Sequence, residues 1–361
     1  MRRVTFLTRL AVLAVVVPTV ISTGGAASGR PATSPTATSP TVTAGYAATK
    51  VDTGTRAPEV APRAAAGAPT LRHVWRDTWR TGINAIARFQ LDTTSYVLSY
   101  QGSSGAARID RLNAAGQGTS NIWRGLWSRG WTSIVPYRLD TGTYLLRYNK
   151  NDGSVTTDRV NTGGRGIRPV WRSRWTSGWT RVVPFSQGRE MYLLGYKQSD
   201  GTVAVDRFNA DGMGTTTVWV SQWEPGWTNI APYREGSNTY LVKYRRGNGA
   251  TKIDRFNGSG MGTTNVWSST WPTGLTTILP MVVGGKSYLL SYRSAAAQAS
   301  LDEFNAGGQG VTPLWAARWS SNWSAFVPYY LTGSDYLLSY KVGSGLVTVS
   351  QFVEGHLRAR M

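Results

Sequence analysis

The sequence has no cysteine, only two histidines, and far fewer acidic than basic residues (19 against 39). Without cysteine, disulfides, thiolate metal sites and a cysteine nucleophile are excluded. His73 and His356 lie at the edges of the repeats described below, which excludes a histidine metal cluster or a histidine-based triad inside the repeats. The formal net charge of +20 favours anionic partners such as acidic glycans, nucleic acid or a bacterial envelope, although it equally suits the solubility of a secreted protein.

Long apolar runs are also scarce. The run at residues 10–21 follows three arginines within the first nine residues, and small residues follow it up to Ala27. It is shorter than the roughly 20 residues that span a membrane, so it predicts a signal peptide over 1–27, a secreted extracellular protein and no stable membrane insertion. Residues 28–70 are rich in Ala, Thr, Ser and Pro, which predicts a disordered tail. A basic C-terminal tail is expected at 354–361.

Tryptophan, in contrast, recurs every 48 residues, and a second tryptophan follows each of these four positions later. A fixed period of this length is typical of a solenoid, a propeller or an array of small units. Because neither tryptophan varies among the copies, we interpret the pairs as packing residues that every unit needs. The six pairs are Trp75/Trp79, Trp123/Trp127, Trp171/Trp175, Trp219/Trp223, Trp267/Trp271 and Trp315/Trp319.

Each copy contains four short runs of β-branched and aromatic residues, separated by turn residues. In one copy these runs are 178–185, 192–196, 203–209 and 217–223. Four antiparallel strands joined by tight turns describe a propeller blade. The tryptophan spacing alone would also allow a helix, but prolines in the same stretch of later copies, such as Pro225, would break it.

The ends of the repeat region predict how the blades close into a ring. The last copy ends at Phe352 and lacks the strand with the tryptophan pair, whereas the repeats begin with that strand, at residues 73–79. Pairing the N-terminal strand with the last blade removes the exposed sheet edges of an open array. We therefore predict an all-β fold over residues 71–353. It is a six-bladed β-propeller of 48-residue, four-stranded repeats, closed by the N-terminal strand joining the last blade.

One copy reads Gly-Trp-Thr at 178–180 and Tyr-Leu-Leu-Gly-Tyr at 192–196, followed by a turn glycine. This pattern resembles the repeat of the tachylectin-like and other secreted β-propeller lectins, over residues 71–352. The resemblance implies sugar binding at several equivalent pockets, often for N-acetylated sugars or fucose. The arginine content is high for a lectin of neutral sugars, so the sugar class stays open and includes acidic glycans.

The tryptophan of the Gly-Trp motif varies among the copies, which makes it a candidate ligand-binding residue. Ile83 and Leu275 replace it in two copies, and packing tolerates such replacements whereas a platform for sugar rings does not. A flat indole offers its face to the apolar side of a pyranose and its N–H to a hydroxyl. An additional core role is the alternative. The candidates are Trp131, Trp179, Trp227 and Trp323.

An Asp-Arg dipeptide in the third run of four copies provides further candidates. Arginine presents a fork of donors and aspartate only accepts, so together they suit vicinal sugar hydroxyls. An ion pair between blades is the alternative role. Asp302-Glu303 and Ser350-Gln351 replace the dipeptide in two copies, and combining both motifs predicts about three intact pockets. The candidate residues are Asp110, Arg111, Asp158, Arg159, Asp206, Arg207, Asp254 and Arg255.

These features predict a secreted, multivalent, lectin-like protein that recognises surface glycans without catalysis, since weak pockets on one ring gain avidity. Nothing marks the two carboxylates that a glycosidase requires, and no nucleophile elbow, phosphate loop or calcium loop is present. We expect no cofactor and no metal. The expected partners are glycans of a cell surface or an envelope polysaccharide, and not nucleic acid. The alternatives are an envelope-associated protein-binding scaffold and, below it, a propeller enzyme of the glycoside hydrolase or lyase type.

Overall fold

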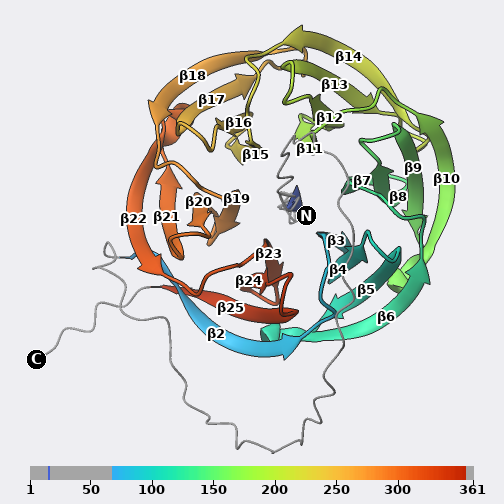
Figure 1. The fold of residues 1–361 in the computed structure, drawn as a ribbon, viewed down its shortest axis with the longest axis horizontal. Coiled ribbons are helices and arrows are strands. Elements are labelled where there is room, and N and C mark those ends of the chain that lie inside the picture. Colours follow the sequence, from blue (N-terminus) through green and yellow to red (C-terminus); the bar gives the residue numbers. More distant parts are fainter. Residues whose placement is uncertain (1–14, 17–66, 355–361) are drawn as a thin grey trace, which may run out of the picture. The chain divides into compact units, whose positions relative to one another are not determined.

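The computed structural model of the chain describes residues 15–16 and 67–354. The described residues form six antiparallel sheets that are the blades of a ring (Figure 1). Each blade has four strands, and the sheet of the first blade has a two-residue strand as a fifth. The predicted all-β, six-bladed β-propeller is therefore confirmed. Within 67–354, no helix has the length and apolar character needed to cross a membrane. The predicted signal peptide and the two predicted tails lie outside the described residues, apart from 15–16, 67–70 and 354.

Each blade runs from an innermost strand at the centre of the ring to an outermost strand (Figure 1). Blade 1 contains β3 (Ala85–Leu91), β4 (Thr94–Gln101), β5 (Ala106–Leu112) and β6 (Thr119–Leu126), and blade 2 contains β7 (Ser133–Leu139), β8 (Gly142–Tyr148), β9 (Ser154–Val160) and β10 (Ile167–Arg174). Blade 3 contains β11 (Arg181–Gln187), β12 (Glu190–Tyr196), β13 (Thr202–Phe208) and β14 (Thr215–Gln222), and blade 4 contains β15 (Asn229–Glu235), β16 (Asn238–Tyr244), β17 (Ala250–Phe256) and β18 (Thr263–Thr270). Blade 5 contains β19 (Thr277–Val283), β20 (Lys286–Arg293), β21 (Gln298–Phe304) and β22 (Val311–Arg318), and blade 6 contains β23 (Ala325–Leu331), β24 (Ser334–Tyr340), β25 (Leu346–Glu354) and β2 (Pro69–Thr78). A two-residue strand, β1 (Val15–Val16), pairs with β3, and three one-turn 3-10 helices follow third strands: η1 (Ala114–Gly116), η2 (Thr162–Gly164) and η3 (Ala306–Gly308).

The innermost strands carry proline in the middle of the strand, which fits their position at the inner edge of each sheet. Proline has no N–H to donate, so it is tolerated in an edge strand where that group would not pair with the neighbouring strand. The first copy has Arg88 at this position. The other five copies have Pro136, Pro184, Pro232, Pro280 and Pro328.

The ring closes as predicted from the offset of the repeats. Strand β2 pairs antiparallel with β25, with Leu71 opposite Phe352 and Trp75 opposite Val349 (Figure 1). The backbone N–H of Trp79 extends the pairing by donating to the carbonyl of Gly345 at 2.8 Å. Strand β2 thus becomes the outermost strand of blade 6, so that this blade, like the other five, has four strands from centre to rim.

A buried tyrosine in each second strand fixes the loop that leads to the next blade. Tyr100 is fully buried, and its hydroxyl donates to the carbonyl of Ser128 at 2.8 Å. The same oxygen accepts the backbone N–H of Trp131 at 3.4 Å. This pair of bonds recurs at all six blade junctions. It explains why the second strand of every copy has a Tyr-x-x-x-Tyr motif, as at Tyr96 and Tyr100, whose second tyrosine never varies. The equivalent tyrosines are Tyr148, Tyr196, Tyr244, Tyr292 and Tyr340.

Candidate functional site between the blades

Each junction between two blades brings together four repeat positions, and we call this group an inter-blade site. One blade contributes two residues: the second tryptophan of its tryptophan pair and, four positions later, the residue at the tryptophan position of the Gly-Trp motif. The next blade contributes the variable residue of its Tyr-x-x-x-Tyr strand, one position before the second tyrosine, and the aspartate of its third strand. Sites are named by the two blades that form them, so site 1/2 contains Trp127, Trp131, Arg147 and Asp158.

Site 1/2 is filled by an arginine of the protein itself. The guanidinium carbon of Arg147 lies 4.4 Å from the ring centroid of Trp127 and 4.8 Å from that of Trp131. The Nη2 atom of Arg147 lies 2.7 Å from Oδ2 of Asp158. The side chain of Asp158 has no exposed surface. Burial raises the pKa of Asp158, and the positive charge of Arg147 offsets part of that effect. The arginine therefore compensates a buried carboxylate while it occupies the space beside both indoles.

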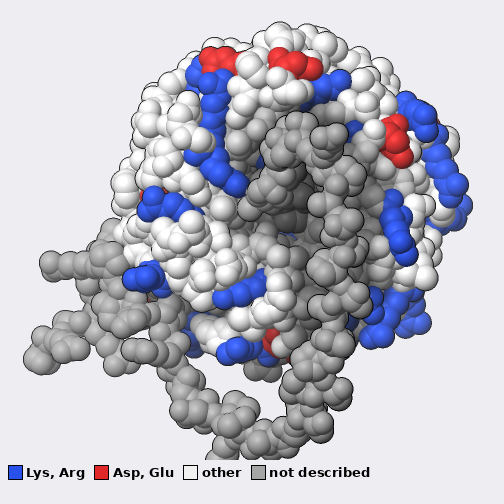
Figure 2. Space-filling model, viewed as in Figure 1, with Lys and Arg blue, Asp and Glu red and all other residues white. Residues whose placement is uncertain are grey.

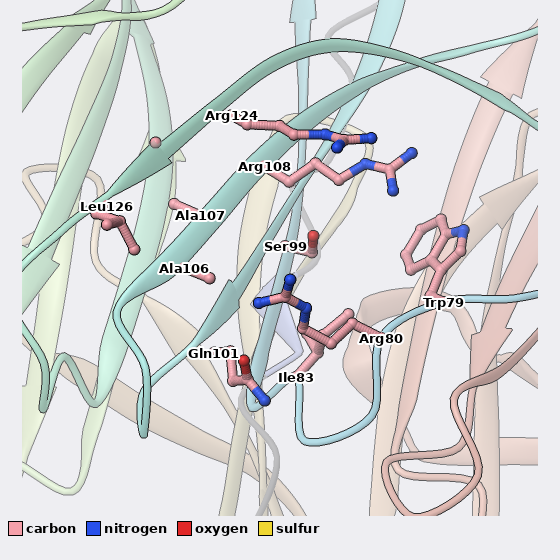
Figure 3. Close-up of a pocket in the computed structure, with 11 residues that line it drawn as sticks. Trp79, Arg80, Ile83, Ser99, Gln101, Ala106, Ala107, Arg108, Arg124 and Leu126 are labelled. Atoms are coloured by element: carbon pink, nitrogen blue, oxygen red, sulfur yellow. The ribbon is translucent and has the colours of Figure 1, made fainter.

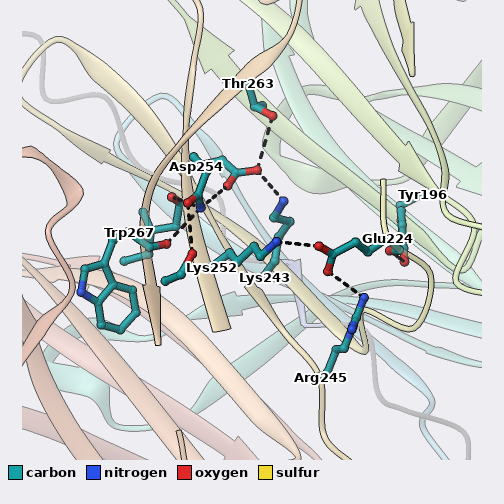
Figure 4. A network of polar contacts seen from close by, with 11 residues as sticks. Tyr196, Glu224, Lys243, Arg245, Lys252, Asp254, Thr263 and Trp267 are labelled. Atoms are coloured by element: carbon teal, nitrogen blue, oxygen red, sulfur yellow. Dashed lines mark hydrogen bonds and ion pairs between the residues drawn. The ribbon is translucent and has the colours of Figure 1, made fainter. Parts of the chain in front are cut away.

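Site 3/4 is filled in the same way by lysine. Nζ of Lys243 lies 4.4 Å from the ring of Trp223 and 5.3 Å from that of Trp227, and 2.5 Å from Oδ2 of Asp254. Burial lowers the pKa of Lys243, and Asp254 offsets part of this effect. Figure 4 shows this pair beside a second, more exposed group in which Glu224 binds Lys252 and Arg245. The site is therefore saturated by charges of the protein itself.

Site 2/3 is filled by the indole of Trp179 instead of a cation. The variable residue there is Gly195, and a Cβ on it would come within 3.1 Å of the Trp179 ring. Nζ of Lys197 lies 5.2 Å from that ring. The aspartate of this site, Asp206, accepts a hydrogen bond from Thr215 Oγ1 at 2.8 Å. Glycine at 195 is thus explained by the close approach of the neighbouring ring.

Site 6/1 is open, because smaller residues replace both large side chains. Ile83 stands at the Gly-Trp position and Ser99 at the position of Arg147. A pocket of about 540 Å³ lies here, within the usual range of about 300–1,000 Å³ for small-molecule sites. Figure 3 shows Arg108 and Arg124 side by side on one wall, with Arg80 and Trp79 on the opposite side. The lining residues are Trp79, Arg80, Ile83, Ser99, Gln101, Ala106, Ala107, Arg108, Arg124, Gly125 and Leu126.

The charges of this pocket are predominantly positive. Nε of Arg108 lies 2.6 Å from Oδ1 of Asp110, a carboxylate that is 1% exposed and lies behind the lining residues. Burial raises the pKa of Asp110, and hydrogen bonds from Arg108 and Asn121 offset part of that effect. Nε of Arg124 donates to Asn121 Oδ1 at 2.8 Å. Three guanidinium groups therefore surround a space whose lining residues include no carboxylate, and of these arginines Arg80 and Arg124 are exposed.

The structure separates the two members of each predicted Asp-Arg pair. Asp158 is buried under Arg147, whereas Arg159 is exposed on the opposite face of β9 and donates to the carbonyl of Thr141. Arg111, Arg207 and Arg255 are likewise exposed, and Asp110 and Asp254 are buried. The aspartates that form ion pairs do so within their own blade, with Arg108, Arg147 and Lys243.

The predicted tryptophans also differ from one another in their surroundings. Trp131 is 7% exposed and Trp227 is 1% exposed, and both lie under cations, so neither presents an open ring face. Trp179 and Trp323 are partly buried, with lysine ammonium groups 5.2 and 4.8 Å from their rings. The pocket residues Arg80, Arg108 and Arg124 were not among the candidates. The signal that could have found them is the coincidence of Ile83 with a small residue at position 99.

On the face drawn in Figure 2, the basic residues do not gather in one patch. On the face in Figure 2, lysine and arginine side chains are spread around the ring, with a few acidic groups between them. The pocket of site 6/1 is distinguished by its geometry and by its local charge. Among the described residues, no group of histidine and carboxylate side chains is placed to hold a metal ion.

The fold and these sites define the chain as a six-bladed β-propeller with a basic inter-blade pocket. The sequence matches no protein-family model, and no curated protein matches it either. Among solved structures, it is similar to a putative 6-phosphogluconolactonase of Bacteroides fragilis (13% identity, 68% of this chain and 84% of that chain, TM-score 0.47).

Two further solved structures show a similar degree of likeness. One is the periplasmic gluconolactonase of Pseudomonas aeruginosa (13% identity, 63% of this chain and 68% of that chain, TM-score 0.45). The other is an exo-β-1,3-galactanase from Phanerochaete chrysosporium (11% identity, 72% of this chain and 71% of that chain, TM-score 0.43). Similarity at this level carries no information about activity.

Proposed function

We propose that the protein is a secreted glycan-binding propeller whose site 6/1 binds an acidic sugar. One observation carries the proposal: a pocket of about 540 Å³ walled by Arg80, Arg108 and Arg124 beside Trp79. The resemblance of the repeat to propeller lectins supports a sugar as the ligand. The arginine-rich wall supports a carboxylated or sulfated one.

The chemistry of the lining suits such a ligand. Arginine presents planar, paired donors that match a carboxylate or sulfate group, and these charge-assisted bonds are stronger than neutral ones. Arg108 already shares its charge with Asp110, but Arg80 and Arg124 form no ion pair among the described contacts of the ring. Ser99 and Gln101 supply hydroxyl and amide groups, and Ile83 and Leu126 supply apolar surface. The site thus offers both charge recognition and contact with a sugar ring.

Binding without reaction fits the pocket better than catalysis. A glycoside hydrolase needs two carboxyl groups beside the scissile bond, about 5–9.5 Å apart. The lining residues include no carboxylate, and the one nearby carboxylate, Asp110, is held by Arg108 and Asn121. We therefore assign the ligand a passive role, as a sugar that is held and released unchanged.

Calorimetric titration with glucuronic acid and glucose tests the proposal, because the two sugars differ in one carboxylate. Wild type should bind glucuronic acid at least about tenfold more tightly than glucose, and Arg124→Gln should remove most of this preference. Arg172→Gln is the matched control, since Arg172 holds the equivalent strand position in blade 2, where Arg147 fills the site. Equal affinity for both sugars, or an equal loss in both variants, would contradict the proposal.

A salt series separates the pocket from diffuse attraction by the whole basic surface. Exposed charges are screened over about 8–10 Å at physiological ionic strength, so attachment through the scattered arginines of Figure 2 should vanish at high salt for every variant alike. Binding in the pocket should weaken with salt but keep the difference between Arg124→Gln and Arg172→Gln. Loss of that difference would favour an envelope-associated scaffold held by charge.

A further inference from the structure

Among the described residues, site 4/5 has a carboxylate without a protein cation, and it also lacks the indole that fills site 2/3. Asp302 lies opposite Leu289 in the strand pairing, as Asp158 lies opposite Leu145 and Asp254 opposite Leu241. The backbone therefore holds all three carboxylates at equivalent positions. In sites 1/2 and 3/4 a protein cation covers the carboxylate, at 2.7 and 2.5 Å.

In site 4/5 the residues that could cover Asp302 are small. Ser291 takes the place of Arg147 and Lys243, and Ser300 lies opposite Ser291 with their hydroxyls 2.6 Å apart. Asp302 has one hydrogen bond, from Ser300 Oγ at 3.4 Å, and forms no ion pair among the described residues. The guanidinium of Arg293, the nearest arginine in sequence, is bound to Gln298.

The neighbouring blade leaves the same position uncovered. Leu275 replaces the indole that in site 2/3, as Trp179, packs against Gly195 and fills the site. Asp302 is partly exposed, whereas Asp158 and Asp254 are 0% and 3% exposed. The carboxylate of site 4/5 is thus reachable from solvent.

The filled sites show which chemistry this arrangement of residues accepts. In both, a cation lies 4.4 Å from the ring of the second tryptophan and in contact with the aspartate. An aromatic face and a carboxylate that both lie beside a cation attract it through the ring quadrupole and the opposite charge together. Site 4/5 retains both attracting groups, as Trp271 and Asp302, and lacks the cation.

We propose that site 4/5 binds the ammonium group of an amino sugar, with Asp302 as the counter-ion and Trp271 as the aromatic face. The ammonium takes the place that Lys243 Nζ takes in site 3/4. Ser291 and Ser300 supply hydroxyls for the remaining polar groups of the ligand. This site shares no residue with the acidic-sugar pocket of site 6/1, so the two proposals stand independently.

Calorimetry at about pH 7 with glucosamine and glucose tests this, because the two sugars differ in one ammonium group. Wild type should bind glucosamine at least about tenfold more tightly than glucose, and Asp302→Asn should abolish the difference. Asp206→Asn is the matched control, since its carboxylate holds the equivalent position in a site filled by Trp179. Ser291→Lys should also abolish binding, by supplying the lysine that site 3/4 already has.

Three results would overturn the assignment: no preference for glucosamine in wild type, retained preference in Asp302→Asn, or an equal loss in Asp206→Asn. Nα-acetyl-lysine amide serves as a second ligand, and tighter binding of it than of glucosamine would show that the site takes a lysine side chain instead of an amino sugar. Glucuronic acid titrated into Asp302→Asn provides the folding control. If Asp302→Asn binds glucuronic acid as wild type does, the ring of the variant is intact. If wild type does not bind glucuronic acid either, the function proposed for site 6/1 is refuted, and the glucosamine titration still decides site 4/5.

Discussion

Sites 1/2 and 6/1 have the same backbone and opposite contents. In site 1/2, Trp131 and Arg147 occupy the space between the blades, and the arginine neutralises Asp158. In site 6/1, Ile83 and Ser99 leave about 540 Å³ open in front of three arginines. The difference teaches that a ligand site in this ring arises where a repeat loses its large side chains. A tryptophan at the Gly-Trp position accompanies a filled site at junctions 1/2, 2/3 and 3/4.

The largest expected effect is a loss of stability when the arginine that fills site 1/2 is removed. Arg147→Ala leaves Asp158 buried without its cation, which should lower the free energy of unfolding by about 3–5 kcal/mol in chemical denaturation. Adding Asp158→Asn to the same variant should restore part of that loss, because the buried charge is then gone. Arg172→Ala, an exposed arginine of the same blade, should change stability by no more than about 0.5 kcal/mol. A loss below about 1 kcal/mol for Arg147→Ala would contradict the role given to this pair.

The next largest effect on stability is expected at Asp302 of site 4/5, and this effect depends on pH. Burial raises the pKa of Asp302 to about 6. The folded state therefore holds this proton more tightly than the unfolded state, so its contribution to stability is lost as pH rises through about 6. Asp302→Asn should stabilise the protein by about 2 kcal/mol at about pH 7.5 and hardly at all near pH 4.

Asp200 serves as a control, because its contribution to stability should change with pH in the opposite direction. The backbone N–H of Thr202 donates to exposed Asp200 and holds the pKa of its carboxyl below the usual range. Its stabilising contribution is therefore present at neutral pH and lost on acidification. Asp200→Asn should lower stability at neutral pH and have no effect in acid. Thermal unfolding at both pH values measures both variants, and equal signs for the two would refute the distinction.

Much of the fold follows from the sequence, because it depends on local spacing. The 48-residue period, the alternation of short strands and turns, and the offset of the first strand at Trp75 and Trp79 are all properties of a single chain segment. Each blade buries the same faces, so the same residues recur in each copy. The pairing of β2 with β25 confirms what that offset predicts.

The site could not be predicted in the same way, because its contents come from two blades at once. The exposure of Trp131 depends on Arg147, which lies in the next blade at a position where other copies have serine, glycine or lysine. Reading each motif within its own copy gives the candidates Trp131 and Trp227. The pocket is found only when Ile83 and Ser99, which lie on the two sides of one junction, are considered together.

Filling site 6/1 with a tryptophan side chain should make it resemble site 1/2 and weaken ligand binding. Ile83→Trp installs the side chain that four other copies carry, and it should weaken glucuronic acid binding about tenfold, or about 1.4 kcal/mol, without unfolding the ring. Leu275→Trp is the matched variant at site 4/5 and should leave glucuronic acid binding unchanged. Calorimetric titration compares the two, and an equal loss in both would locate the ligand outside site 6/1.

The smallest effect is expected at the exposed edge of site 3/4. Lys252 forms an ion pair with Glu224, whose side chain is 51% exposed, so Lys252→Gln should cost only about 0.2–1 kcal/mol. Lys243→Gln, nine residues away in the same blade, should cost several times more because it uncovers Asp254. Denaturation at low and high salt should show screening for Lys252 and little for Lys243. Similar losses for both lysines would contradict the distinction between the buried and the exposed pair.

The most direct test of the account is a crystal structure of the protein soaked with glucuronic acid. We expect density for the sugar in site 6/1, with its carboxylate within hydrogen-bonding distance of Arg80 or Arg124, and none beside Trp131 or Trp227. Sugar density stacked on those two tryptophans, with site 6/1 empty, would contradict the claim that ligand sites in this ring arise where the large side chains are lost.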